Sequence, residues 1–107
     1  MTMTEIVCEV ADLQPDRGVC ALVGQAQVAL FLLRDGSLHA LDNRDPFSSA
    51  NVLSRGLTGT IGGRPIVASP LYKQRFDLRT GQCLDDPTVH VPVYEARRVG
   101  DRVAVCI

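Results

Sequence analysis

"IVASPLYKQRFDLRTGQCL", residues 66–84, is the stretch that decides the fold. It begins as an apolar strand, enters a loop that contains Pro70, and returns as a second strand. A turn at Arg79-Thr80-Gly81 then leads into a third short strand. The pattern therefore predicts short strands joined by tight connections, which is typical of a β protein. The expected strands cover residues 66–69, 74–78 and 82–84.

An earlier stretch, "LDNRDPFSSANVLSRG", residues 41–56, has a similar loop. Each loop places a proline in a short strand-to-loop motif, Asp45-Pro46-Phe47 in the first and Ser69-Pro70-Leu71-Tyr72 in the second. The region over residues 43–65 is rich in glycine, proline and serine, and we expect it to be an irregular excursion. Structureless connections of that length are uncommon in small domains and tend to be functional.

Further short strands are predicted outside the two loops. Residues 28–33 are apolar on both faces, which is typical of a central strand covered on each side. Asp35-Gly36 stands between apolar flanks and predicts a hairpin, because glycine adopts a positive φ without steric cost. Pro92, inside an expected strand, indicates a sheet edge, where a missing N–H is tolerated. The other expected strands are residues 5–10, 18–24, 38–41, 89–93 and 103–107.

No window of the sequence has a convincing helical period. The sequence therefore predicts one all-β domain over residues 1–107, an antiparallel β-sandwich or small open barrel. We expect its base to come from residues 1–42 and 85–107. A subdomain made by the two loops is expected over residues 43–84.

The length, composition and charge of the sequence exclude some classes of function. The chain has 107 residues, of which 46% are hydrophobic, enough for one core without compulsory disulfides or metal. Its formal net charge of -1 argues against a nucleic-acid partner. No stretch approaches the roughly 20 apolar residues that span a membrane, and the first ten residues lack the pattern of a leader. We therefore expect a cytoplasmic protein.

The four cysteines are far apart in sequence and form no Cys-x-x-Cys pair. Zinc and cluster sites usually show closely spaced pairs, because two ligands from one tight loop arrive already positioned around the ion. Each cysteine stands among apolar neighbours, so free thiols that behave as small hydrophobic residues are the favoured interpretation. Disulfides stay possible, although a cytoplasmic location argues against them. The cysteines are Cys8, Cys20, Cys83 and Cys106.

At the two loops the sequence resembles the Rieske iron–sulfur fold. Ferredoxin-like members of that fold carry Cys-Pro-His in the first loop and Cys-Pro-Leu-His in the second. The flanking sequences "ALDNR", "LSRG" and "RFDLRTGQ" stand where those ferredoxins have almost the same residues. The resemblance covers nearly the whole chain. The resemblance implies a Rieske [2Fe-2S]-type antiparallel β-sandwich or open barrel with two cluster-binding-like loops.

The same resemblance locates the four cluster ligands, and none of these positions holds the residue of the family. In a Rieske centre two thiolates hold one iron and two imidazoles hold the other. Here Asp45 and Ser69 occupy the cysteine positions, while Phe47 and Tyr72 occupy the histidine positions. Oxygen donors replace thiolate poorly on a soft cluster, and phenylalanine has no donor. We therefore expect no cluster, metal or other cofactor in this chain.

Within the wider fold, the sequence is most similar to the small subunits of NAD(P)H-dependent assimilatory nitrite reductase. Recurrent sequence motifs of that family are "DPF", "VLSRG" and "SPLxKQRF", found here at residues 45–47, 52–56 and 69–76. The resemblance implies a large-subunit partner with FAD, a [4Fe-4S] cluster and sirohaem, which reduces nitrite to ammonia with electrons from NAD(P)H. This chain would then be part of an enzyme without being catalytic alone.

Two hypotheses concern the loop residues themselves. Phe47 and Tyr72 could plug the gap between the loops with packed rings, because an empty cavity loses contacts. Basic side chains near the loops could form a docking surface for the large subunit, with a solvated rim as the alternative. These residues are Arg44, Arg55, Lys73, Arg75 and Arg79.

Two other functions stay open. The chain could be a Rieske-type ferredoxin, an electron carrier that holds a cluster or metal through ligands outside the familiar pattern. It could also be a non-catalytic binding or regulatory module of another oxidoreductase, since a fold alone does not fix a function. Iron and sulfide assays on the purified chain discriminate the electron carrier from the other two.

Overall fold

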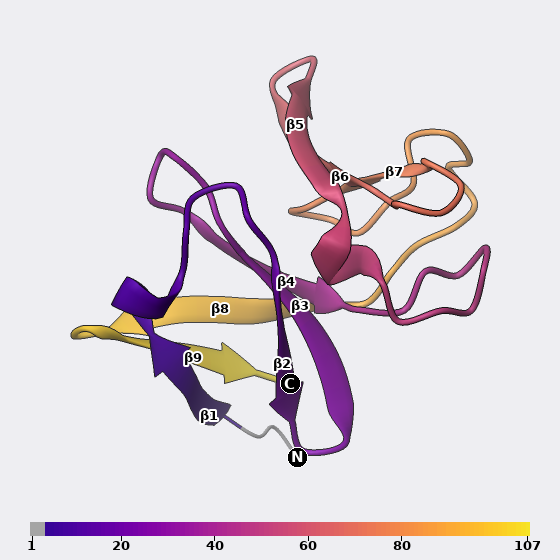
Figure 1. The fold of residues 1–107 in the computed structure, drawn as a ribbon. Helices are drawn as coiled ribbons and strands as arrows, with labels where there is room; N and C mark the ends of the chain where they lie inside the picture. Colours follow the sequence, from indigo (N-terminus) through magenta and orange to yellow (C-terminus); the bar gives the residue numbers. More distant parts are fainter. Residues whose placement is uncertain (1–3) are drawn as a thin grey trace.

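The computed structural model describes residues 4–107; residues 1–3, the start of the stretch expected to lack a leader, lie outside the described part. Its larger unit is built from the strands β1 (Thr4–Glu9), β2 (Val19–Val23), β3 (Ala26–Leu32), β4 (Leu38–Asp42), β8 (Val93–Val99) and β9 (Arg102–Cys106). These form a six-stranded antiparallel sheet in the order β1-β9-β8-β4-β3-β2. The sheet curls until its end strands β1 and β2 approach each other, which gives a nearly closed barrel (Figure 1).

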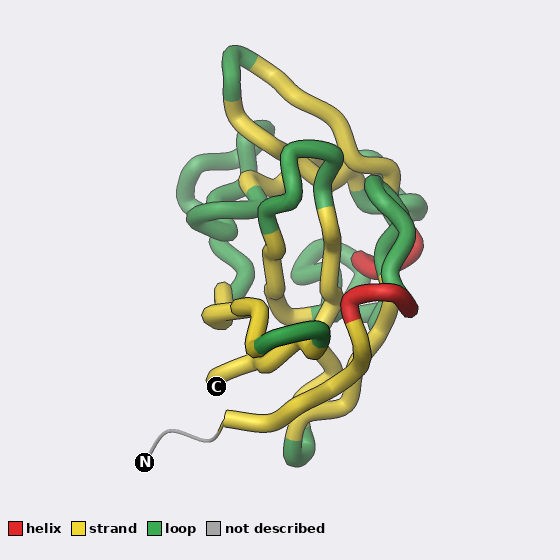
Figure 2. The backbone as a smooth tube through the Cα atoms, turned by 90° about the vertical axis from the view of Figure 1, so that its left-hand side faces the viewer, coloured by secondary structure: helices red, strands yellow, loops and turns green. Residues whose placement is uncertain are grey.

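A smaller antiparallel sheet, with the strands β5 (Leu57–Ile61), β6 (Arg64–Ala68) and β7 (Arg75–Asp77), stands beyond one end of the barrel. Figures 1 and 2 show the β5–β6 hairpin projecting away from it. Two short 3₁₀-helical turns, η1 (Val10–Asp12) and η2 (Leu53–Arg55), complete the described elements. None of the helices within residues 4–107 has the length and apolar character needed to cross a membrane. The predicted all-β class is confirmed.

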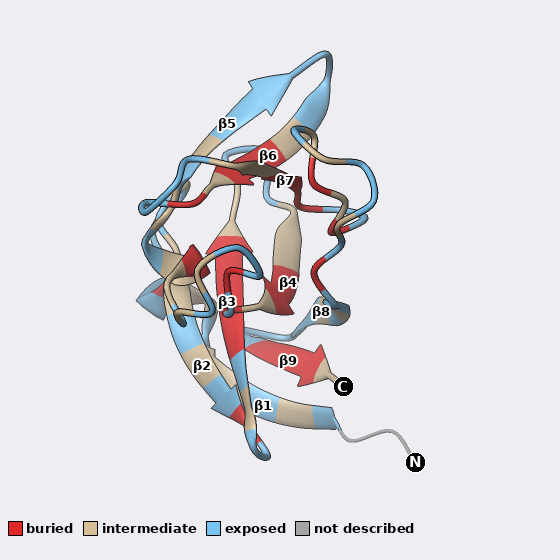
Figure 3. Cartoon of the chain, turned by 90° about the vertical axis from the view of Figure 1, so that its right-hand side faces the viewer, coloured by how far each residue is buried: buried red, intermediate tan, exposed pale blue. Residues whose placement is uncertain are grey.

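Strand β3 is the central strand that the sequence predicts, and most of it is buried (Figure 3). Its two faces contribute to two cores. Successive side chains of a strand point to opposite faces, so Ala29 and Phe31 enter one core and Val28 and Leu30 enter the other. The first core lies between the barrel and the small sheet, and consists of Ala29, Phe31, Leu41, Leu53, Val67, Phe76, Leu78, Cys83 and Val91. The second fills the barrel, and consists of Leu13, Val23, Val28, Leu30, Ala40, Val103 and Val105.

The hairpin predicted at Asp35-Gly36 is confirmed and joins β3 to β4. Gly36 has φ +87°, and the N–H of Leu33 donates to the carbonyl of Ser37 at 2.9 Å. The Asp35 carboxylate accepts the N–H of Ser37 at 2.9 Å, a local bond that fixes the turn. The pairing of β3 with β4 then brings His39 opposite Phe31, at the end of the barrel that faces the small sheet.

The excursion expected over residues 43–65 is only partly irregular, which corrects the prediction. Its second half contains β5 and the start of β6, joined by Gly62 and Gly63 with φ +56° and +78°. Positive φ at both central residues is the requirement of a tight hairpin turn. The sequence pattern does not mark β5, because its side chains are mostly exposed and Gly59 interrupts any apolar alternation.

The strand expected over residues 89–93 is also wrong, because regular pairing begins only at Val93, where β8 starts. Pro92 lies just before the strand, and its carbonyl accepts the N–H of Asp42 at 2.9 Å. β8 lies between β9 and β4, so it is not the edge strand that this proline suggests. In place of the strand expected over residues 82–84, Gln82 and Cys83 make isolated bridges. An alternation of apolar residues indicates which side chains are buried. A strand forms only where the backbone also pairs with a neighbouring strand.

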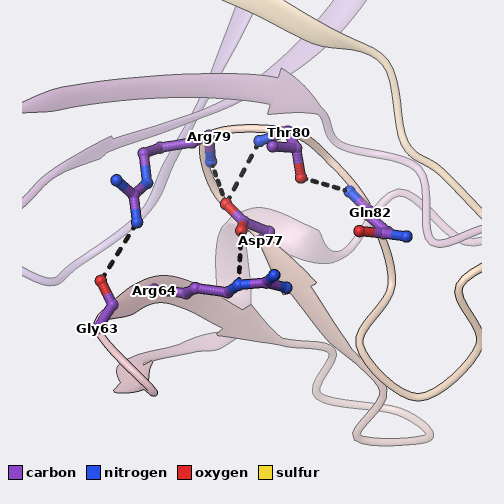
Figure 4. A network of polar contacts seen from close by, with 6 residues as sticks. All are labelled: Gly63, Arg64, Asp77, Arg79, Thr80 and Gln82. Carbon is purple, nitrogen blue, oxygen red and sulfur yellow. Dashed lines mark hydrogen bonds and ion pairs between the residues drawn. The ribbon is translucent and has the colours of Figure 1, made fainter.

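The turn after β7 is organised by one buried carboxylate, that of Asp77, which is 4% exposed (Figure 4). Its Oδ1 accepts the backbone N–H of Arg79 at 2.7 Å and that of Thr80 at 3.3 Å. The Arg64 guanidinium lies 4.0 Å from Oδ2. The Arg79 guanidinium reaches across to the carbonyl of Gly63 at 3.2 Å. Asp77 therefore ties the turn to the β5–β6 hairpin.

We expect Asp77→Ala to lower the free energy of unfolding by about 2 kcal/mol, because two turn N–H groups lose their acceptor in a partly buried place. Asp77→Asn keeps an oxygen at the same position and should lose clearly less. Urea denaturation of both variants against the wild type measures the difference. Equal losses for the two variants would show that the carboxylate charge, and not the accepted bonds, holds the turn.

Candidate functional site

The two loops singled out in the sequence have the same backbone conformation. In the first, the N–H of Ser49 donates to the carbonyl of Asp45 at 2.7 Å; in the second, the N–H of Lys73 donates to the carbonyl of Ser69 at 3.0 Å. Ser49 and Lys73 both adopt the left-handed conformation, with φ +63° and +65°. Because residues other than glycine seldom adopt this conformation, two equivalent examples indicate one turn geometry used twice.

The first residue of each turn also caps its own loop. Asp45 Oδ1 accepts the N–H of Phe47 at 2.8 Å, and Ser69 Oγ lies 3.4 Å from the N–H of Leu71. Such local side-chain bonds are typical of Asp and Ser at the start of turns. Each loop is therefore closed both by its backbone and by its leading side chain.

A hydrogen bond between these two leading residues joins the loops. Ser69 Oγ donates to Asp45 Oδ2 at 2.5 Å. Both side chains are buried, with Asp45 0% and Ser69 1% exposed. The structure thus brings together the two residues that the resemblance places at the cysteine positions of a Rieske domain.

The expected aromatic plug is wrong. Tyr72 is 63% exposed and Phe47 is 37% exposed. The ring of Phe47 packs instead against Phe76 of β7, with centroids 6.2 Å apart and planes inclined by 46°. The buried hydrogen bond between Ser69 and Asp45, and not a pair of aromatic rings, joins the two loops.

The four residues that the resemblance places at the ligand positions, Asp45, Phe47, Ser69 and Tyr72, supply neither a thiolate nor an imidazole to a [2Fe-2S] cluster. A Rieske centre needs two thiolates and two imidazoles. The oxygens of Asp45 and Ser69 already bond to each other and to the loop backbone, and Phe47 has no donor atom. Over residues 4–107 there is no group of three or more His, Cys, Asp or Glu side chains placed to hold a metal ion. Cys8, Cys20, Cys83 and Cys106 are free thiols, and Cys83 is buried in the first core.

The five basic residues of the predicted docking surface differ in their surroundings. The Arg75 guanidinium forms two bonds with the Asp85 carboxylate, at 2.6 and 3.2 Å, and these hold the pKa of Asp85 below its ordinary 3.8. Arg79 is turned to the carbonyl of Gly63, as described above. The other three are exposed and lack an ion pair within the described part of the chain. These are Arg44, Arg55 and Lys73.

The sequence interpretation missed Leu71 as an exposed residue and missed a cleft. Leu71 is 50% exposed although it is aliphatic; its place directly after Pro70 in a loop was an available signal. The cleft, of about 600 Å³, opens between the β3–β4 hairpin and the β5–β6 hairpin, and Arg34, His39 and Thr60 contribute to its walls. No sequence pattern marks it, because its walls come from segments far apart in the chain.

His39 lines this cleft, and burial shifts the pKa of its imidazole. Its Nε2 lies 2.9 Å from Ser37 Oγ, and Ser37 Oγ donates in turn to Asp35 Oδ1 at 2.6 Å. Burial lowers the pKa of His39 below its ordinary 6.5, and the carboxylate of Asp35 opposes that effect.

We expect the free energy of unfolding to fall as the pH drops below about 6.5. A lowered folded-state pKa means that the unfolded chain takes up the proton first, so this contribution is present above the unfolded pKa and is lost as pH falls. His39→Gln should flatten that part of the profile. Urea midpoints between about pH 8 and pH 5, measured for the wild type and for His39→Gln, give the two profiles. An unchanged slope in His39→Gln would contradict the assignment.

Comparison with known proteins identifies the family. The model of the Rieske-like [2Fe-2S] domain family matches residues 4–106. The nitrite reductase (NADH) small subunit of Escherichia coli K12 is 45% identical over 98 residues, which are 91% of each chain. A crystal structure from Mycobacterium tuberculosis, described as an NADH-dependent nitrite reductase small subunit, has a TM-score of 0.97 at 50% identity and covers 100% of this chain and 96% of that one.

Two further similarities concern the wider context. The NAD(P)H nitrite reductase large subunit of Klebsiella oxytoca is 49% identical over 81 residues, which are 76% of this chain and only 8% of that protein. The ferredoxin of carbazole 1,9a-dioxygenase from Nocardioides aromaticivorans IC177 has a TM-score of 0.84 at 23% identity, with 96% of each chain covered, which shows a shared fold alone. The chain therefore belongs to the family of nitrite reductase (NADH) small subunits, built on the Rieske-like [2Fe-2S] domain.

Proposed function

We propose that this chain is the small subunit of an NAD(P)H-dependent nitrite reductase and that it binds and supports the large subunit without a cluster of its own. In this proposal the large subunit carries FAD, a [4Fe-4S] cluster and sirohaem, and reduces nitrite to ammonia. The small chain takes no catalytic step. The proposal places the assembly in the cytoplasm, a reducing compartment with which the four free cysteines agree.

The observation that carries the cluster-free role is the buried bond from Ser69 Oγ to Asp45 Oδ2 at 2.5 Å. In a Rieske domain the cluster itself connects the two loops. Here the side chains at the cysteine positions make that connection directly and use their oxygens to do so. The loops are therefore held in place by groups that the chain supplies.

The similarity to the Klebsiella oxytoca large subunit supports the partner. Its match to 76% of this chain occupies 8% of that protein, so a domain similar to this one is part of a large-subunit chain there. A domain that is covalently joined in one enzyme and separate in another is expected to contact the same neighbours in both. The proposal therefore assigns the large subunit as the binding partner.

We include the basic docking surface in the proposal in a modified form. Arg44, Arg55 and Lys73 are exposed and free to meet carboxylates of a partner. Arg75 and Arg79 contribute less, because their guanidinium groups are already engaged by Asp85 and by the Gly63 carbonyl. Charges of this kind chiefly raise the association rate and set the orientation of docking.

Co-purification of this chain with the large subunit of the same organism tests the proposal, with iron and sulfide assayed on the separated small chain. We expect joint elution and a small chain free of iron. A chain that carries about two irons and two sulfides would be an electron carrier, and the cluster-free role would be wrong. A chain that elutes apart from the large subunit would be a module of another oxidoreductase.

A further inference from the structure

Exposed apolar side chains gather on the two joined loops. Phe47, Leu71 and Tyr72 are 37%, 50% and 63% exposed, and each lies within two or three residues of the buried Ser69–Asp45 bond. The other exposed large hydrophobic residues are spread over four strands, β1, β2, β5 and β8. We call the loop surface formed by Arg44, Phe47, Leu71, Tyr72 and Lys73 the loop tip. Grouped apolar residues within a polar setting are typical of an interaction site.

Several hydrogen bonds hold the loop tip in one conformation. Both turns are closed by a backbone bond, capped by their first side chain, and linked to each other through Ser69 and Asp45. Phe47 is further supported by its contact with Phe76. Rigid side chains lose little conformational entropy when a partner covers them, so they serve well as binding anchors. Aromatic residues are enriched among such anchors.

The charges of the loop tip indicate the chemistry of the partner. Arg44 and Lys73 are exposed and make no ion pair within residues 4–107, although the chain as a whole carries a formal charge of -1. The carboxylate that joins the two loops, that of Asp45, is buried and faces Ser69, so it does not neutralise them at the surface. The complementary surface is therefore apolar at its centre and carries carboxylates around that centre.

We propose that the loop tip is the surface by which this chain docks on the nitrite reductase large subunit. Phe47, Leu71 and Tyr72 enter an apolar recess of the large subunit, and Arg44 and Lys73 meet carboxylates at its rim. The inference rests on the proposed function, because it takes the large subunit as the partner. It adds the orientation: the end that would carry a cluster in a Rieske protein faces the partner, and the barrel faces away.

Binding of the separately purified full-length chain to the large subunit, measured by calorimetry, tests the inference. The double variant Leu71→Ser/Tyr72→Ser removes two exposed anchors and keeps the loop hydrogen bonds, which involve the backbone N–H of Leu71 and neither of the two side chains. Leu22→Ser, at an exposed leucine of β2 on the barrel, is the matched control. We expect the loop variant to bind at least about tenfold more weakly than the wild type, and Leu22→Ser to bind as the wild type does. Melting curves verify that both variants fold.

A second measurement addresses the charges. Arg44→Gln/Lys73→Gln should slow association and reduce its dependence on salt, because exposed charges act mainly on the encounter of the partners. Leu71→Ser/Tyr72→Ser should keep the salt dependence of the wild type and speed dissociation instead. A general loss of folding would not separate the two variants in this way.

The outcomes distinguish the two proposals. If the wild-type chain does not bind the large subunit, the proposed function fails. If the wild type binds and the loop variant binds equally well, the loop-tip inference fails while the proposed function stands. A loss in Leu22→Ser with none in the loop variant would place the interface on the barrel, and so would also overturn the inference.

Discussion

Asp45→Ala is expected to lower the free energy of unfolding by about 3 kcal/mol, because two hydrogen-bond donors lose a fully buried acceptor. The hydroxyl of Ser69 and the N–H of Phe47 both donate to this carboxylate, at 2.5 and 2.8 Å. Neither donor bonds to a second acceptor within residues 4–107, and water cannot reach the Asp45 carboxylate, which is 0% exposed, without opening the loops. Urea denaturation at neutral pH measures the loss.

A double-mutant cycle separates the link between the loops from the capping of the first loop. Ser69→Ala removes the link and keeps the Asp45 cap, so it should cost about 1–2 kcal/mol. The double variant should lose clearly less than the sum of the single losses, because the shared bond can be removed only once. Additive losses would show that the Ser69–Asp45 bond does not stabilise the fold.

Ser48→Ala provides the matched control for this cycle. Ser48 lies in the first loop, is half-buried, and accepts only the N–H of Ala50, at 3.2 Å. It makes no bond to the second loop. Ser48→Ala should lower the free energy of unfolding by less than about 1 kcal/mol. Its effect should add to that of Ser69→Ala. Additivity here would show that the non-additive effect of Asp45→Ala and Ser69→Ala comes from the bond between the loops.

The elements predicted correctly from the sequence are those fixed by local chemistry. The Asp35-Gly36 hairpin follows from the positive φ that glycine permits, and the central place of β3 follows from a run that is apolar on both faces. Both signals are contained within a few consecutive residues. The β5–β6 hairpin failed for the opposite reason: the Gly62-Gly63 pair was read with its neighbours as loop, because the exposed strand before it has no apolar pattern.

At the candidate site, the sequence located the two loops but not the direction of their side chains. Phe47 and Tyr72 were expected to meet, yet one packs on Phe76 and the other is exposed. In a loop no period fixes which way a side chain points, whereas in a strand the alternation does. The bond between Asp45 and Ser69 was likewise beyond the sequence pattern, because it joins residues 24 positions apart that meet only in the folded chain.

The second large effect is expected at Gly81, in the turn after β7. Gly81 has φ +78°, and a Cβ added there would lie 2.0 Å from the carbonyl oxygen of Val91. Its backbone cannot retreat, since its N–H donates to Asp77 at 2.7 Å and its carbonyl accepts the N–H of Val91 at 2.8 Å. The turn Arg79-Thr80-Gly81 was predicted from the sequence, but the close approach to Val91 requires the folded chain.

Gly81→Ala should therefore lower the free energy of unfolding by about 4 kcal/mol, of which about 1 comes from the left-handed backbone and the rest from overpacking against Val91. Gly63→Ala is the matched control, because Gly63 has the same φ of +78° and no atom within 4 Å of the added Cβ. It should lose only the backbone part, about 1 kcal/mol. Urea denaturation of the two variants isolates the steric contribution as their difference. Equal losses would mean that the segment around Val91 yields freely, and then the contact between the turn after β7 and the segment leading into β8 is not a fixed part of the fold.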